Sequence, residues 1–149
     1  MRLCLVHHAH ALGPEVDPQR PLSTQGLSHA AGLADRVKAR GFVPAVIWHS
    51  GKLRARQTAE AFLMACNPFA EFKMIRGVHP DDPPEILRDR MRVETRDVLV
   101  AGHIPHLTAW LESALPGCPE FPLHGAVALQ SEDDGVTWTE LWRESLATE

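Results

Sequence analysis

Three apolar segments of the chain each end in histidine. Imidazole can serve as a nucleophile, an acid, a base or a metal ligand near neutral pH. A strand that ends in histidine places this group at the edge of a sheet, which is where open α/β folds bind their ligands. The histidines in these positions are His7 and His8, His49, and His103.

A guanidinium follows the second of these segments. Ser50 comes directly after His49, and Arg54 stands about one turn into the helix that we expect next. Arginine binds phosphoryl oxygens through paired hydrogen bonds, and the N–H groups at the start of a helix favour negative charge. If the three strands are parallel, their ends share one edge and form a pocket that suits phosphate.

Strand and helix patterns alternate along the chain. Ser23 is placed to cap a helix that ends at Gly41, after a loop over residues 13–21. The alternation predicts a three-layer α/β/α fold, with a mainly parallel sheet, helices on both faces and a C-terminal antiparallel hairpin. No repeat or linker divides the chain, so we expect residues 1–149 to form a single domain. The other expected helices are 53–66, 84–92 and 105–115, and the expected strands are 2–6, 43–48, 72–75, 97–101, 127–130 and 136–142.

The composition is ordinary for a globular protein, with 149 residues, 44% hydrophobic and 23% charged. A net charge of −4 without a basic block argues against nucleic-acid binding. The sequence shows no apolar run of membrane-spanning length and no secretion signal, so we expect a cytoplasmic monomer that does not bind membranes. The three cysteines form no CxxC pair and indicate neither a disulfide framework nor a zinc knuckle.

Four segments resemble motifs of the histidine phosphatase superfamily. Residues 5–9, Leu-Val-His-His-Ala, resemble its Arg-His-Gly motif, and residues 20–23, Arg-Pro-Leu-Ser, with the glycine that follows, are similar to its Arg-Pro-Leu-Thr segment. Residues 50–60 resemble its Ser-x-x-x-Arg-Ala-x-Gln-Thr-Ala helix, and residues 100–105 its Val-Gly-His-Asn-Pro turn. The motifs follow the family's order, and the short chain looks most like the SixA-type phosphohistidine phosphatases.

This resemblance implies a phosphatase that uses no cofactor. His8 would be the nucleophile and would carry a transient phosphohistidine, which water then hydrolyses. His7, Arg20, Arg54 and His103 would bind the phosphoryl oxygens, and the last two would also stabilise charge on the transferring group. Because cationic side chains supply the electrostatics, no metal is needed. The expected substrate is phosphohistidine on a partner protein, or a small phosphate ester.

The first motif departs from the family at two positions. His7 replaces the arginine before the nucleophile, and Ala9 replaces the glycine after it. Arginine is always charged and has a planar fork of donors, whereas histidine has at most two donors and is charged only part of the time. Arg20 and a protonated His7 would compensate. We therefore expect phosphate affinity to fall as the pH rises through the titration of His7.

Two aspartates are candidates for a general acid. Asp81 and Asp82 follow the third expected strand, where an acid could enter the site. The alternative interpretation is that they shape the turn or cap the helix that follows Pro83. A phosphorylated imidazole needs little protonation to leave, so this acid could be dispensable.

Two other functions remain open. His7, His8 and His10 with His103 and His106 could bind a metal, although no carboxylate lies in these motifs. The chain could instead bind phosphate or phosphohistidine without turnover, because His7 weakens the site.

Overall fold

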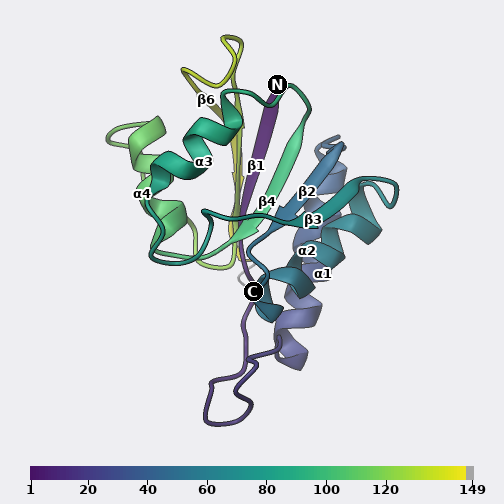
Figure 1. Ribbon diagram of the computed structural model, residues 1–149. Coiled ribbons are helices and arrows are strands. Elements are labelled where there is room, and N and C mark those ends of the chain that lie inside the picture. Colours follow the sequence, from purple (N-terminus) through teal and green to yellow (C-terminus); the bar gives the residue numbers. More distant parts are fainter. Residues whose placement is uncertain (147–149) are drawn as a thin grey trace.

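The computed structural model describes residues 1–146 (Figure 1). Strands β3, β2, β4 and β1 are parallel neighbours, and β5 and β6 add an antiparallel pair beside β1. The expected α/β class, the mainly parallel sheet and the C-terminal antiparallel pair are confirmed. In chain order the elements are β1 (Arg2–His7), α1 (Thr24–Ala39), β2 (Val46–His49), α2 (Leu53–Cys66), β3 (Glu71–Met74), α3 (Pro84–Met91), β4 (Val98–Gly102), α4 (His106–Ala114), β5 (Ala126–Gln130) and β6 (Thr139–Glu144).

Helices cover both faces of the sheet. In Figure 1, α1 and α2 lie on one side of the strands and α3 and α4 on the other. Leu3 and Leu5 of β1 pack into the core beneath α3 and α4, whereas Cys4 and Val6 pack beneath α1 and α2. Successive strand residues point to opposite faces. A strand segment buried on both faces is therefore continuously apolar, as residues 3–6 of β1 are.

The first helix begins where the sequence predicts. The hydroxyl of Ser23 accepts the Gly26 N–H at 2.9 Å and so caps α1. A Cβ at Gly26 would collide with the carbonyl of His10, so glycine allows the helix to approach this loop closely. The apolar spacing of the sequence would place Leu27 on the buried face with Ala30, Ala34 and Val37, but Leu27 is exposed and Leu33 is buried instead.

The last strand differs most from the prediction. The expected strand over residues 136–142 begins only at Thr139 and continues past the predicted end. A bulge between Ala128 and Leu129 also breaks the alternation of the β5–β6 pair. As a result, Trp138 packs in the core under α3 and α4 while Trp142 packs against the opposite core. Strict alternation along the expected strand would place these two tryptophans, four residues apart, on one face, and the structure contradicts this expectation.

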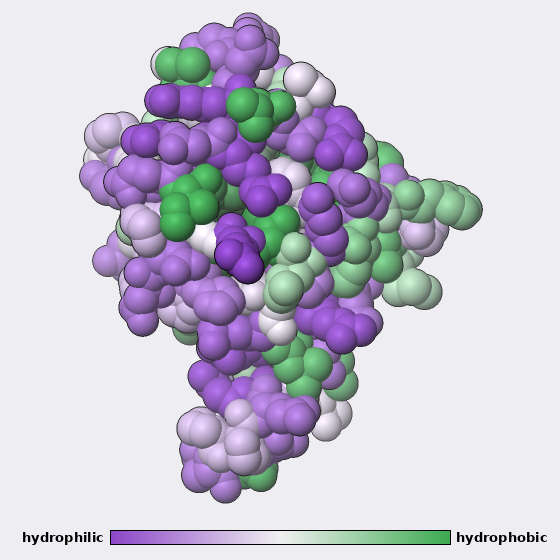
Figure 2. Space-filling view, viewed as in Figure 1, coloured by the Kyte–Doolittle hydropathy of each residue, from purple (hydrophilic) through white to green (hydrophobic). Residues whose placement is uncertain are grey.

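None of the helices described has the length and hydropathy that a membrane crossing requires. On the face seen in Figure 2, hydrophobic residues form separate patches among hydrophilic ones.

Candidate active site

The carboxyl ends of β1, β4 and β2 meet at one edge of the sheet. His7 is paired with Gly102, and His49 is paired with Ala101. The residues that follow these strands therefore leave the sheet side by side. The rings of His8 and His103 lie 5.2 Å apart between centroids.

His8 is held in the tautomer that a nucleophile needs. Its Nδ1 lies 2.7 Å from the carbonyl oxygen of Ala9. A carbonyl can only accept, so Nδ1 carries the hydrogen and Nε2 keeps its lone pair. Desolvation, partly opposed by this hydrogen bond, lowers the pKa of His8 to about 4, and the positive charges of Arg54 and Arg20 contribute. At neutral pH His8 thus offers an unprotonated Nε2.

His7 is held in the opposite tautomer by a histidine that the sequence did not single out. The backbone N–H of His124 donates to Nδ1 of His7 at 2.8 Å, so the hydrogen of the neutral ring is on Nε2. The two rings are stacked, with centroids 4.9 Å apart and planes 4° from parallel. Desolvation, with His8, His124 and Arg54 nearby, lowers the pKa of His7 to about 3. His7 therefore supplies a neutral N–H donor, and the expected cation at this position is not supported.

His124 also binds the backbone of His8. Its Nδ1 lies 2.7 Å from the carbonyl oxygen of His8 and donates to it. The residue has a φ of 53°, in the left-handed region that non-glycine residues rarely adopt. Arg20, with a φ of 50°, shares this conformation. Such conformations persist where the surrounding structure fixes them, and they cluster at functional sites.

His103 faces His8 with a free ring nitrogen. Its Nε2 is 2.6 Å from Oγ of Ser50, and Ser50 also accepts the backbone N–H of Lys52 at 3.2 Å. The serine hydroxyl can donate to Nε2 or accept from it, and Nδ1 of His103 has no hydrogen-bond partner within residues 1–146. Desolvation, with the neighbouring positive groups, lowers the pKa of His103 to about 2. His103 is thus a buried, neutral imidazole beside His8.

Two arginines give the site its positive charge. Arg54 makes no ion pair in the described part of the chain, and its buried Nε has no hydrogen-bond partner there. Burial, and then the charge of Arg20, lower the pKa of Arg54. Arg20 is oriented by its Nε, which donates to the carbonyl of Leu12 at 3.0 Å. Unpaired guanidiniums beside an unprotonated imidazole form a site for an anion.

The helix that carries Arg54 is fastened to the loop after β1. Thr58 accepts the N–H of Ala9 at 3.0 Å and donates to the carbonyl of Arg54 at 2.8 Å. Gln57 accepts the N–H of Leu22 at 2.7 Å. These bonds hold the nucleophile loop, the arginine helix and the segment after Arg20 in one arrangement.

Other sequence candidates lie outside this cluster. Asp82 accepts the N–H of His79 at 2.9 Å, which matches the turn-forming interpretation, and Asp81 is exposed. Among the hydrogen bonds of residues 1–146, none joins either aspartate to His8.

His49 also lies outside this cluster. It accepts the N–H of the glycine two residues on and packs against Phe72, away from the site. Neither ring nitrogen of the buried His106 has a partner in the same part of the chain.

One group of histidines could approach a metal ion. His7, His8 and His124 each have a ring nitrogen within 4.8 Å of the other two, whereas Nδ1 of His10 bonds a serine hydroxyl. The parallel rings of His7 and His124 do not direct their in-plane lone pairs at a common point. The positive charge of Arg54 also disfavours the binding of a metal cation here. The arrangement fits an anion better than a metal.

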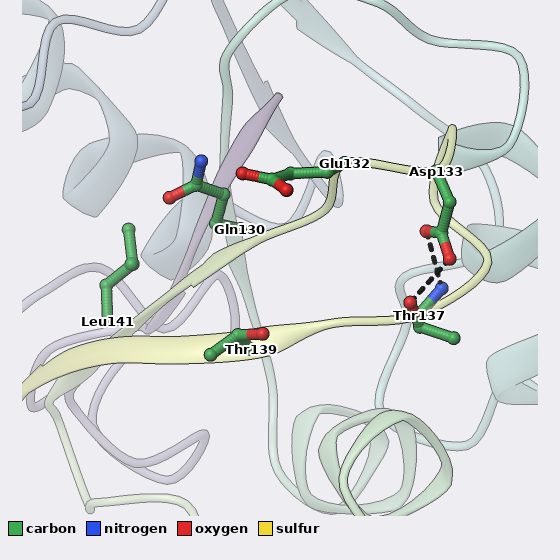
Figure 3. A pocket seen from close by; sticks show the side chains of 6 residues that line it. All are labelled: Gln130, Glu132, Asp133, Thr137, Thr139 and Leu141. Atoms are coloured by element: carbon green, nitrogen blue, oxygen red, sulfur yellow. Dashed lines mark hydrogen bonds between the residues drawn. The ribbon is translucent and has the colours of Figure 1, made fainter.

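A second hollow lies at the other end of the sheet. It encloses about 470 Å³ on the β5–β6 hairpin, and Figure 3 shows Asp133 bonded to Thr137 at its edge. Gln130 in its wall pairs with Arg2 at the start of β1, whereas the histidines follow the end of β1. This hollow is therefore separate from the candidate site.

Several solved structures of known proteins share the fold of this chain. No curated protein matches the sequence. The protein histidine phosphatase SixA, solved with tungstate, is 22% identical with a TM-score of 0.86, and 97% of each chain is covered. A proposed phosphohistidine phosphatase SixA from Agrobacterium tumefaciens is 25% identical with a TM-score of 0.79 and the same coverage. The mycobacterial glucosyl-3-phosphoglycerate phosphatase is 14% identical with a TM-score of 0.70, covering 97% of this chain and 99% of its own.

A family model agrees with these structures. The model of branch 1 of the histidine phosphatase superfamily matches residues 5–76, which include the nucleophile loop and the arginine helix. Residues 5–76 thus match the histidine phosphatase superfamily, and the described chain has the fold of the SixA structures.

Proposed function

We propose that this protein hydrolyses phosphohistidine on another protein, through a phosphohistidine intermediate on His8. The observation that carries the proposal is the Nδ1–H bond from His8 to the Ala9 carbonyl, which leaves Nε2 unprotonated beside Arg54 and His103. Such a nucleophile needs no further base. The resemblance to SixA structures supports the choice of substrate.

The reaction has two displacements at phosphorus. Nε2 of His8 attacks in line, a bond to phosphorus forms, and the bond from phosphorus to the leaving imidazole breaks with its electron pair. Arg54, the Nδ1–H of His103 and the Nε2–H of His7 donate to the phosphoryl oxygens as charge is redistributed among them. Water then attacks the phosphohistidine, which releases inorganic phosphate and restores His8.

Two features favour a protein-borne phosphoryl group over a small ester. The connection from β3 to α3, residues 75–83, is short, so little chain is available to cover the site. His8 itself is only partly buried. A substrate on another protein needs such access.

The test is turnover of an aryl phosphate and a phosphohistidine peptide, in the presence of chelator. We expect the wild type to hydrolyse both, His8→Ala to be inactive, and His29→Ala, a half-buried position of α1 outside the histidine cluster, to match the wild type. Mass spectrometry of quenched reactions should find the phosphate on His8. Full activity in His8→Ala would overturn the mechanism.

The neutral state of His7 favours a second candidate, a phosphohistidine-binding module with little or no turnover. Loss of one donor to the transition state typically lowers the rate by ~10²–10³. In that case the wild type binds the phosphorylated peptide but does not hydrolyse it, and His7→Arg gains activity.

A further inference from the structure

An apolar groove lies beside the candidate active site, where β3 ends and α3 begins. It encloses about 430 Å³. The side chains of Met74 and Ile86 stand at its rim, with 62% and 43% of their surfaces exposed. Exposed apolar side chains around a hollow are typical of a binding surface. The groove is lined by Ser50, Met74, Ile75, Arg76, Gly77, His79, Asp82 and Ile86.

The apolar walls are fixed by two glycines. The side chain of Met74 lies in the space that a Cβ on Gly51 would take, and that of Ile86 lies in the corresponding space over Gly77. Both glycines have positive φ, 89° and 91°, which other residues rarely adopt. The main chain therefore admits these side chains closely and holds the groove open.

Ser50 connects the groove to the phosphoryl site. Its hydroxyl lies 2.6 Å from Nε2 of His103, and its carbonyl accepts the Nε2–H of His79 at 2.9 Å. His79 and Ser50 both line the groove. The strand order gives the same placement, since β2 stands between β4, which leads to His103, and β3, which leads to the groove.

We propose that this groove receives an apolar side chain of the protein segment that carries the phosphohistidine. The inference rests on the proposed function. The groove lining includes neither His8 nor Arg54, so a small phosphate held by these two side chains lies outside the groove. Only a substrate that continues beyond its phosphoryl group fills both places, and the apolar walls select a side chain such as leucine.

The test compares two phosphohistidine peptides that differ only beside the phosphorylated residue. One has two leucines on each side and the other has two serines. We expect kcat/KM for the leucine peptide to be about tenfold higher, because burying one such side chain is worth at least that factor. In Met74→Lys and Ile86→Lys this preference should disappear, while hydrolysis of an aryl phosphate stays within about twofold of the wild type.

Met64→Lys and Val93→Lys are the matched controls, because these side chains are also exposed and apolar but do not line the groove. Both should keep the leucine preference. Equal kcat/KM for the two peptides in the wild type, or loss of the preference in the controls, would overturn the proposal.

If the protein is not a phosphatase, the same assays give a result that differs from failure of the groove proposal. If the wild type hydrolyses neither the aryl phosphate nor the peptides, the phosphatase assignment fails. Binding of the same two peptides, followed by fluorescence polarisation, then decides on the groove: tighter binding of the leucine peptide that Met74→Lys removes supports it, and equal binding refutes it.

Discussion

Anion affinity should not follow the protonation of His7, contrary to the expectation from the sequence. Its Nδ1 accepts a backbone N–H, and burial with nearby positive groups lowers its pKa to about 3. At pH 6 only about one His7 ring in a thousand is charged. To keep His7 charged at pH 7, a bound anion would have to raise this pKa by about four units, which costs about 5.5 kcal/mol. It would also have to break the hydrogen bond from His124.

Sulfate is a suitable ligand for the test, because its charge does not change between pH 5 and pH 8. Calorimetric titration of the wild type and of His7→Gln across this range gives two series of Kd values. Other titrating groups act on both proteins, so they cancel in the ratio of the two series. We expect this ratio to stay constant within about twofold. A ratio that changes by about tenfold for each pH unit would show that His7 binds as a cation and would refute the assignment.

Three other perturbations test how the fold holds the site, each by urea denaturation. Thr58→Val leaves the buried N–H of Ala9 without an acceptor and should lower the free energy of unfolding by about 1–3 kcal/mol; Thr58→Ser keeps the hydroxyl, and an equal loss there would contradict this reason. Gly26→Ala forces a methyl group against a carbonyl and should destabilise by about 1–3 kcal/mol, whereas Gly32→Ala on the same helix, where a Cβ would meet only the Arg36 side chain at ordinary contact distance, should not destabilise. The lowered pKa of His103, about 2, stabilises the fold fully above pH 6.5, and this contribution is lost as the pH falls toward 2. Between pH 6.5 and pH 5 the wild type should therefore lose about 2 kcal/mol more than His103→Asn, and parallel losses would show that the buried ring is not held neutral.

Much of the fold could be predicted because local patterns and tertiary packing agree. Residues 3–6 of β1 are all apolar because both faces of the strand are buried there, and Ser23 caps α1 because its hydroxyl reaches the third N–H. The helix over residues 53–66 has the expected bounds. The C-terminal strand was misplaced because a bulge and the left-handed residues Asp134 and Gly135 change the pairing, and no alternation of side chains reveals them.

The residues placed at strand ends could be found from the sequence, but their protonation could not. His8 and His103 follow buried strands, so the strand pattern alone brings them to one edge. His124 comes from a loop far along the chain, and nothing in its neighbours marks it. Its backbone N–H decides which nitrogen of His7 carries the hydrogen. The position of this hydrogen depends on a tertiary contact, and the residue types of the sequence do not reveal that contact.

The two arginines lower the stability of the unliganded protein and favour the binding of an anion. Arg20 and Arg54 lie close enough for one to lower the pKa of the other, and no carboxylate in residues 1–146 pairs with Arg54. Like charges held together weaken a folded state, and a ligand that binds only the folded state stabilises it by mass action. Neutral residues at these positions would strengthen the unliganded protein and weaken its hold on an anion. A negatively charged group that binds between the two guanidiniums would therefore supply part of the stability of this fold.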